Sequence, residues 1–364
     1  MAPKPGRPPG EPRDRDLRPA NARIWGVDVE ARFRRSPGTG SARGWCRALV
    51  ITPLLLALSA GAAPAREAGG TPVAFVAAEK ASELVAVDLT TGRVVGRIRM
   101  PSGPRNVAAT GDLRFLLVTS PRAGTVTVID SFTQRIVKTF RGFGHPNDVA
   151  VEADYAYVTD SRRGQLIVIE LARRRIVARV GVGRQPVSVA VGDVALVTHR
   201  PPNPYLTVVD LRRPRTPRVS RLAVPAVGGA RDISERADSA NAYVTGWSSG
   251  GVGGIDWGNR RVLWWRKVGV AVRDVAFDYF HGRRVWVSDV HAGEVIALSS
   301  NEGRVLRRLR GCSGAGPIAF GGQAWVAASC RNGQGLAVWD TRRWRRTLVP
   351  IGGNPYGVAV AVVP

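Results

Sequence analysis

The sequence predicts an all-β chain that folds as one seven-bladed β-propeller with four antiparallel strands in each blade. Three observations support this fold. The β-prone runs are short, they recur at a nearly constant spacing, and the two ends of the repeat array complement each other.

The repeating unit is clearest between Pro146 and Gly183. There, four runs rich in Val, Ile and Tyr are separated by Asp, Gly or Arg-rich turns, and no window shows a sustained helical period. The second run of the unit recurs seven times, with anchor residues at Val76, Val118, Val158, Val197, Val244, Val287 and Val326. Their spacings of 39 to 47 residues are typical of propeller blades.

The array begins inside one unit and ends inside another. Residues 71–79 form a second run with no first run before it, whereas residues 354–360 form a first run with no second run after it. We therefore expect the C-terminal strand to complete the N-terminal blade. Ring closure of this kind removes the free strand edges that an open array would expose.

Two copies of the second run read YVTD (Tyr157–Asp160) and YVTG (Tyr243–Gly246). With these segments and the blade period, residues 71–364 resemble the YVTN-repeat family of seven-bladed β-propellers, which are exported, YncE-like proteins. The family is similar to the propellers of lactonases and amine dehydrogenase subunits. The resemblance implies the fold, and it implies no single activity because one fold hosts many functions.

The N-terminal segment differs in composition from the repeats. Residues 1–43 are rich in Pro, Gly and Arg, and we expect a disordered basic leader there, unless translation starts later than Met1. Residues 44–65 have the layout of a signal peptide, with a basic flank, an apolar core too short for a membrane anchor and an A-x-A exit. We therefore expect a secreted or cell-envelope protein whose propeller spans residues 66–364.

Loops of such a meander alternate between the two faces of the disc. The loop before each first strand and the loop after each second strand share one face, where the central channel opens; we call it the mouth face. Turns on the opposite face begin with Asp88, Asp130, Asp210, Asp256 and Asp340, which we interpret as turn caps. The candidate binding residues of the mouth face are His145, Asp148, Asp160, His199, Arg231, Asp232, Trp247, Arg273, Asp274, Asp289 and His291.

Three of these carboxylates hold equivalent register positions, just before the first-strand Val or Ile. Asp148, Asp232 and Asp274 should ring the channel mouth together with Asn106 and Ser188. Such a ring could bind a divalent cation through oxygen ligands and serve a lactonase- or lyase-like enzyme. Alternatively, each carboxylate accepts hydrogen bonds from loop amides or pairs with an arginine, and no cofactor is bound.

Two blades combine a histidine with carboxylates on the mouth face. Blade six places Arg273, Asp274, Asp289 and His291 there, and blade three places His145, Asp148 and Asp160 there. A histidine in this setting can be a general base or a metal ligand, or a loop residue with satisfied hydrogen bonds. Trp247 lies in a mouth-face loop without a packing register, so it is the best candidate for stacking on a ligand.

The chain is strongly basic, with a net charge of +25, which falls to +19 for residues 66–364. Many arginines fall in the fourth, outer run of each unit, where charge blocks edge-to-edge pairing. The same rim could attach the protein to an anionic envelope polymer. No stripe of interleaved aromatic residues accompanies the charge, so we expect no specific nucleic-acid binding, and we expect a monomer.

Two cysteines remain in the propeller, because Cys46 lies in the signal segment. Cys312 precedes the first strand of blade seven and Cys330 follows its second strand, so both lie on the mouth face beside neighbouring strands. Disulfides persist outside the cytosol, and we predict a Cys312–Cys330 bond. Two buried free thiols and an incomplete metal site are the alternatives.

These features predict an exported, non-catalytic propeller that binds a small ligand or a protein partner at its mouth face. Two alternatives stay open from the sequence. One is the cation-dependent lactonase- or lyase-like enzyme, and the other is attachment through the arginine rim.

Overall fold

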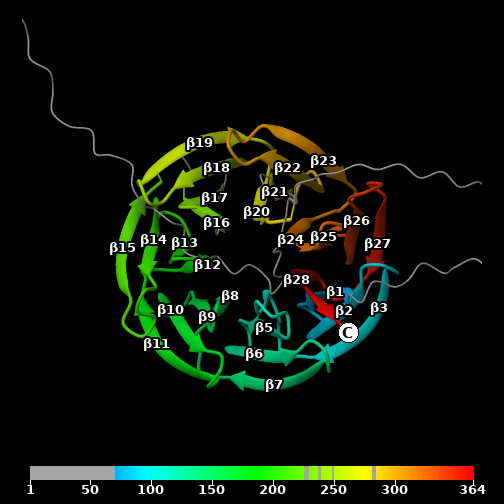
Figure 1. The fold of residues 1–364 in the computed structure, drawn as a ribbon, viewed down its shortest axis with the longest axis horizontal. Helices are drawn as coiled ribbons and strands as arrows, with labels where there is room; N and C mark the ends of the chain where they lie inside the picture. Colours follow the sequence, from blue (N-terminus) through cyan, green and yellow to red (C-terminus); the bar gives the residue numbers. More distant parts are fainter. Residues whose placement is uncertain (1–69, 225–228, 237–238, 248–249, 281–283) are drawn as a thin grey trace, which may run out of the picture. The chain divides into compact units, whose positions relative to one another are not determined.

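The computed structural model describes residues 70–224, 229–236, 239–247, 250–280 and 284–364. The strands in these ranges form seven four-stranded antiparallel sheets around a central axis (Figure 1), which confirms the predicted propeller. The predicted leader (1–43) and signal peptide (44–65) lie outside the described residues. Within the described ranges, no helix is long and apolar enough to cross a membrane.

Each blade has the same strand order from the channel to the rim. The inner strands are β4 (Val107–Ala109), β8 (Pro146–Glu152), β12 (Pro186–Val191), β16 (Ala230–Arg236), β20 (Val272–Asp278), β24 (Ala315–Gly321) and β28 (Pro355–Val363). The second strands are β1 (Thr71–Ala78), β5 (Phe115–Ser120), β9 (Tyr155–Asp160), β13 (Val194–His199), β17 (Asn241–Gly246), β21 (Arg284–Asp289) and β25 (Trp325–Cys330). The third strands are β2 (Glu83–Asp88), β6 (Thr125–Asp130), β10 (Gln165–Glu170), β14 (Tyr205–Asp210), β18 (Gly251–Asp256), β22 (Glu294–Ser299) and β26 (Gly335–Asp340). The outer strands are β3 (Arg93–Arg99), β7 (Arg135–Phe140), β11 (Arg175–Gly181), β15 (Arg218–Ala223), β19 (Arg261–Lys267), β23 (Val305–Arg310) and β27 (Arg346–Pro350).

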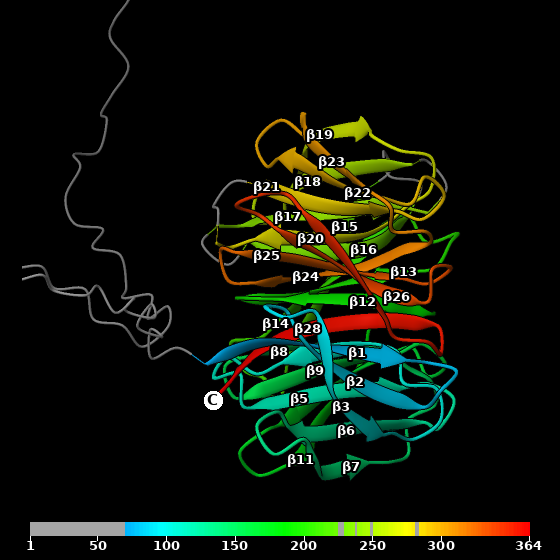
Figure 2. The same cartoon turned by 90° about the vertical axis from the view of Figure 1, so that its right-hand side faces the viewer.

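The C-terminal strand closes the ring as predicted. β28 pairs antiparallel with β1 from Thr71↔Val363 to Ala78↔Pro355 (Figure 2). It forms the inner strand of the first blade (Figure 1). Gly357 lets this strand approach the second blade, because its N–H donates to the Arg105 carbonyl oxygen at 2.7 Å. A Cβ at this position would lie 2.4 Å from that oxygen, so any larger residue would push the two blades apart.

The strand register corrects one predicted anchor. Val158 pairs with Val149 in blade three, but the equivalent Ile318 of blade seven pairs with Ala328 and not with Val326. Residues two apart in a strand share a face, and Val326 and Ala328 are both fully buried. Hydrophobicity alone therefore cannot tell which of the two residues is the anchor. Ser329 and Cys330 consequently occupy the positions of the Thr and Asp of the YVTD segment.

Hydroxyl groups link successive blades near the channel. Thr119 accepts the N–H of Asn106 at 3.1 Å and donates to the carbonyl oxygen of Asn147, in the next blade, at 3.2 Å. Equivalent pairs of hydrogen bonds, between 2.8 and 3.2 Å long, are made by Thr159, Thr198 and Thr245. These bonds fix the inner strands of blades two to six relative to one another, and so they position the side chains at the channel mouth.

The turns opposite the mouth face are capped as predicted. Asp88, Asp130, Asp210 and Asp340 each accept the backbone N–H two residues later at 2.7 to 3.0 Å. Asp256 accepts the N–H of Asn259 at 2.9 Å. These carboxylates therefore act in the turns, as expected.

Deletion of residues 354–364 should abolish cooperative unfolding and cause association, because it removes the inner strand of the first blade and exposes the edge of β1. Thermal melting and size-exclusion chromatography would measure both effects. A chain that lacks only Pro364, which follows β28, is the control and should behave as the full chain. A monomeric truncated chain with an unchanged melting curve would contradict the closure.

Candidate functional site

The channel mouth is lined at two successive positions of the inner strands. Strand register aligns the first position as Arg105, Asn147, Val187, Arg231, Arg273, Gly316 and Tyr356. The second position, immediately after it, holds Asn106, Asp148, Ser188, Asp232, Asp274, Pro317 and Gly357. The predicted ring of Asn106, Asp148, Ser188, Asp232 and Asp274 is therefore present, and a ring that contains three arginines precedes it.

Two guanidinium groups converge on one tyrosine ring. The Cζ atoms of Arg105 and Arg331 lie 4.5 and 4.6 Å from the ring centre of Tyr356, and Arg105 Nη2 donates to the Tyr356 hydroxyl at 3.0 Å. The Nε atoms of both arginines are buried and have no hydrogen-bond partner among the described residues. These two cations come from the second and seventh blades, and the ring between them comes from the closing strand.

A second cation–π pair lies on the fifth blade. Arg231 Cζ lies 4.5 Å from the Trp247 ring centre, and the indole N–H donates to the carbonyl oxygens of His199 and Ala230 at 3.1 Å each. Trp247, predicted to stack on a ligand, therefore already stacks on Arg231 and is fixed by two hydrogen bonds. Its observed effect is to orient this guanidinium beside the channel.

The three carboxylates of the second ring are held differently. Asp148 accepts hydrogen bonds from Asn106, Ser188 and the N–H groups of Val149 and Val189, at 2.7 to 3.0 Å. Asp232 accepts the N–H of Val275 at 2.8 Å, and Asp274 accepts the Ser288 hydroxyl at 3.0 Å. Asp148 therefore accepts more hydrogen bonds from the protein than Asp232 or Asp274 does.

Burial governs the protonation of these groups. All three retain some contact with channel solvent, yet they lie deep in the disc. Burial, followed by repulsion from Asp274 and Asp148, raises the pKa of Asp232 to about 8. Burial also raises the pKa of Asp274, although Arg231, Ser288 and Arg273 oppose the rise. At neutral pH Asp232 therefore carries a proton, and the mouth carries more positive than negative charge.

The predicted cation site is not assembled. Among the residues that the structure describes, no three His, Cys, Asp or Glu side chains are placed to hold a metal ion. Asp148, Asp232 and Asp274 come from the third, fifth and sixth blades, and Ser188 of the fourth blade lies between the first two in the ring. The surrounding guanidinium groups would also repel a cation.

Three other predicted site residues have structural partners. Asp160 accepts the N–H groups of Gly144, His145 and Arg163, and Asp289 accepts those of Val270, Ala271, His291 and Ala292. Fully buried His199, at the position of Asp160, contacts the Arg184 carbonyl oxygen at 3.0 Å and the Thr207 hydroxyl at 2.9 Å. Each of these side chains ties the loop before the first strand to the end of the second strand.

The two remaining histidines lie outside the arginine cluster. His145 is half-buried, with Nδ1 2.9 Å from the Ser161 hydroxyl, and burial followed by repulsion from Arg105 lowers its pKa. His291 is exposed in the loop that Asp289 caps. Among the described residues, no hydrogen bond or ion pair joins the His291 side chain to Asp274.

The predicted disulfide is confirmed, with 2.11 Å between the Cys312 and Cys330 sulfur atoms. Both cysteines are fully buried, in a cluster that includes Trp286 and Trp339. Cys330 occupies the position of Asp160, so this bond ties together the same two segments that the carboxylate ties in blade three. The alternatives of free thiols and an incomplete metal site are therefore wrong.

Sequence reasoning missed Arg105, Arg331 and Tyr356. Arg105 and Tyr356 share the register position of Arg231 and Arg273, so the same alignment could have found them. Arg331 comes from the loop after a second strand, and its position beside Tyr356 depends on ring closure. The repeat alone gives no signal for it.

Comparisons with known proteins agree with the fold. No family model matches the chain. The chain is 36% identical over 88 residues to two curated relatives, the uncharacterized proteins YncE of Salmonella typhi and Salmonella typhimurium. This match covers 22% of the chain and only 23% of each relative, so the chain is similar to a YncE-like propeller over part of its length.

Solved structures of propellers extend the likeness to most of the chain. A functionally unknown protein from Desulfotomaculum acetoxidans has a TM-score of 0.71 at 13% identity and covers 80% of this chain and 99% of its own. Apo AztD from Citrobacter koseri has a TM-score of 0.65 at 11% identity, with 80% and 98% covered. The periplasmic gluconolactonase PpgL of Pseudomonas aeruginosa has a TM-score of 0.64 at 18% identity, with 81% and 99% covered. At these identities the likeness shows the fold alone.

Asp232→Asn should stabilise the protein at high pH. A folded-state pKa of about 8 for Asp232, above the ordinary 3.8, means that stability falls as pH rises from about 4 to 8. Asn keeps an acceptor for the Val275 N–H and cannot ionise. We expect the Tm to rise by at least about 2 °C at pH 8.5 and to stay unchanged at pH 4. Exposed Asp154 provides the control Asp154→Asn, with no such difference. A lower Tm of Asp232→Asn at pH 8.5 would oppose the assignment.

Cys312→Ala/Cys330→Ala should lower the free energy of unfolding by about 3 kcal/mol, the usual effect of a disulfide that closes a loop of this size. Urea titration of the variant and of reduced wild-type protein measures the loss, and the two should agree closely. Two thiols titrated in denatured, unreduced wild-type protein would show that the bond is absent.

Proposed function

We propose that this chain is an exported, non-catalytic binding module that holds an anionic ligand at its channel mouth. The observation that supports this function is the convergence of four arginines, Arg105, Arg231, Arg273 and Arg331, on a site where burial raises the pKa values of Asp232 and Asp274. The ligand is a small molecule, or an acidic segment of a protein partner, that carries a carboxylate or phosphate group.

The unbalanced charge of these arginines favours an anion. Among the described residues, no carboxylate lies within 4 Å of the guanidinium nitrogens of Arg105, Arg231 or Arg273, and Arg331 has only Glu79, at 3.8 Å. Burial and the neighbouring Arg273 lower the pKa of Arg231, which reflects the cost of holding two cations together. A bound carboxylate or phosphate would relieve this repulsion and accept the paired N–H groups of a guanidinium.

The aromatic rings prepare the site for binding. Tyr356 and Trp247 stack on Arg105, Arg331 and Arg231, so these long side chains lose less conformational freedom when a ligand arrives. A protonated Asp232 could also donate its proton to an anionic oxygen. Affinity should therefore fall as pH rises through about 8, where Asp232 ionises.

The arrangement does not favour catalysis. Ser161 contacts His145 Nδ1 at 2.9 Å, but the hydroxyl also lies 3.2 Å from the carbonyl oxygen of His145, as in a local turn. No hydrogen bond to His145 Nε2 from another described residue is present, so no third group orients this pair. The lactonase-like alternative needs a cation, and the described acidic groups do not form a metal site.

Export is part of this proposal. The Cys312–Cys330 disulfide supports an oxidising compartment, and the signal-peptide pattern of residues 44–65 agrees with it. The expected final location is the cell envelope or the medium.

Arg231→Ala/Arg273→Ala should weaken binding of citrate or inorganic phosphate at least about tenfold, equivalent to ~1.4 kcal/mol, because it removes two of the converging cations. Isothermal titration calorimetry at fixed pH and salt measures the change. The matched control is Arg93→Ala/Arg99→Ala, which removes the same charge from exposed positions of β3 and should change affinity less than about twofold. Equal losses in both variants, or no anion binding by wild-type protein, would refute the mouth site.

A further inference from the structure

The turn between β14 and β15 differs from its counterparts in other blades. It has seven residues, Leu211 to Pro217, whereas the corresponding turns of blades one, two, three and five have four. Its sequence is LRRPRTP, in which a buried leucine is followed by three arginines, two prolines and a threonine. This is the longest third-to-fourth-strand connection in the described part of the chain.

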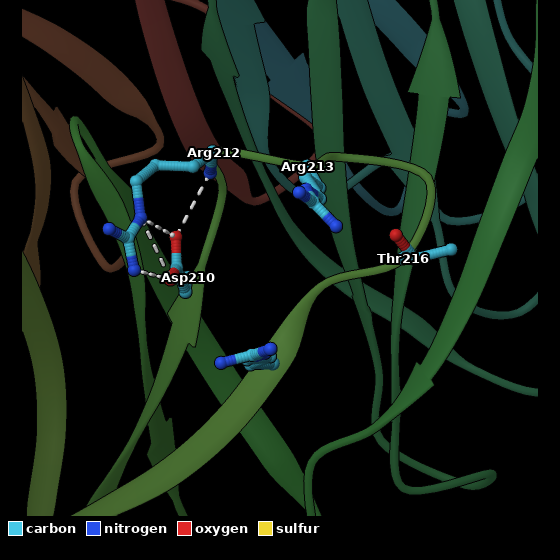
Figure 3. Close-up of a pocket in the computed structure, with 5 residues that line it drawn as sticks. Asp210, Arg212, Arg213 and Thr216 are labelled. Atoms are coloured by element: carbon cyan, nitrogen blue, oxygen red, sulfur yellow. Dashed lines mark hydrogen bonds and ion pairs between the residues drawn. The ribbon is translucent and has the colours of Figure 1, made fainter.

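The turn is held in a defined conformation. Arg212 donates its backbone N–H and its Nε to Asp210 at 3.0 Å, and its Nη2 also contacts that carboxylate (Figure 3). Thr216 donates its N–H to the Arg213 carbonyl oxygen at 2.9 Å. Arg215 points to the neighbouring blade, where its Nη2 lies 3.4 Å from Glu170. The prolines at positions 214 and 217 further limit the backbone.

A hollow of about 540 Å³ lies against this turn, lined by Asp210, Arg212, Arg213, Thr216 and Arg218 (Figure 3). Its volume falls within the range of small-molecule sites, which is about 300 to 1,000 Å³. Three of the five lining residues are arginines, and one is a carboxylate. The hollow therefore carries a surplus of positive charge.

Arg212 neutralises the carboxylate of Asp210, which leaves the charges of Arg213 and Arg218 in the hollow. The hydrogen bonds from Arg212 lower the pKa of Asp210 to about 2, so this carboxylate is ionised and paired at neutral pH. No acidic group of the described residues lies within 4 Å of the guanidinium nitrogens of Arg213 or Arg218, and both residues are exposed. Unlike Arg212, these two are available to a ligand.

The neighbouring rim adds to the positive field. Glu170 of the adjacent blade already forms ion pairs with Arg173 at 2.6 Å, Arg175 at 3.0 Å and Arg215 at 3.4 Å. Three cations thus surround one acidic group beside the hollow. A local excess of one sign of charge raises the concentration of oppositely charged ligands and their association rate.

We propose that this hollow is a second anion site, which binds compact polyanions with two or more adjacent phosphate or carboxylate groups. Arg213 and Arg218 are the contacting cations, Arg212 is a third donor held in place by Asp210, and the Thr216 hydroxyl is a neutral donor. One oxyanion group would fill only part of the volume, so the site favours ligands with several. The site lies at the outer edge of the face opposite the mouth, uses no channel-mouth residue and is independent of the function proposed above.

Its length, and not its number of arginines, distinguishes this turn from its counterpart in blade seven. There, Asp340 is likewise followed by two exposed arginines, Arg342 and Arg343, and Asp340 accepts the N–H of Arg342 at 2.8 Å. That turn has five residues, Thr341 to Arg345, and two fewer than the turn of blade four. The two turns therefore provide equal charge in different geometry, which makes a matched control.

The test uses calorimetric titration with pyrophosphate and with citrate, in the Arg231→Ala/Arg273→Ala background, so that binding at the channel mouth is weakened. Adding Arg213→Ala/Arg218→Ala should weaken binding at least about tenfold, and adding Arg342→Ala/Arg343→Ala should weaken it less than about twofold. Arg213→Lys/Arg218→Lys keeps the charge but loses the paired N–H geometry, and should give an intermediate affinity. The preferred probe identifies phosphate or carboxylate as the recognised group.

Two outcomes would overturn the proposal. One is an equal loss of affinity in the blade-four and blade-seven variants, which would mean attraction by net charge alone. The other is that neither probe binds in the starting background. That background already lacks two of the four mouth arginines, so failure of the mouth site and failure of this site give different results. All substituted residues of both turns are exposed, so the Tm should stay within about 2 °C of the starting protein.

Discussion

Pairing of β28 with β1 is the constraint on which the rest of the molecule depends. It joins residues 71–78 to residues 355–363 and closes a ring in which every inner strand contacts its neighbours. Without it, Tyr356 would not reach the mouth, and Arg105 and Arg331 would have no ring between them. Gly357 is the local requirement for this closure, because only glycine leaves room for the backbone of Arg105. The proposed binding site is thus a consequence of how the first and last repeats meet.

One structural task is solved by different chemistry in different blades. The end of the second strand must be tied to the loop that precedes the first strand. A carboxylate does this in blades three and six, an imidazole in blade four and a disulfide in blade seven. Each adds to backbone hydrogen bonds between the same segments, such as the bond from the Ser161 N–H to the His145 carbonyl oxygen at 3.0 Å. This explains why polar residues at the position of Asp160 looked functional in the sequence, although their partners are backbone groups.

The sequence predicted the propeller, its closure and the disulfide because all three follow from the spacing of the repeats. A period of about 40 residues places equivalent side chains on equivalent blades, so Cys312 and Cys330 had to be neighbours. The sequence predicted the wrong anchor in blade seven, Val326 instead of Ala328, because both residues are hydrophobic and lie on the same strand face. It could not decide whether the ring of carboxylates binds a cation, since the charge there also depends on Arg105, Arg273 and Arg331, which come from three blades. Spacing within a repeat does not show which side chains meet across a ring.

The channel mouth is costly to the fold. Burial makes the ionised carboxylates of Asp232 and Asp274 less favourable than they would be in water. The nearby guanidinium groups of Arg231 and Arg273 also repel each other. Hydrophobic residues in place of these charged groups would remove that cost. The register position of Arg231 and Arg273 already holds an apolar residue, Val187, in the fourth blade. Groups that lower the stability of the folded state are typical of binding sites. An anion that binds only the folded ring would recover part of this free energy, in proportion to the logarithm of its concentration. The mouth is therefore the place where ligand binding would stabilise this protein most directly.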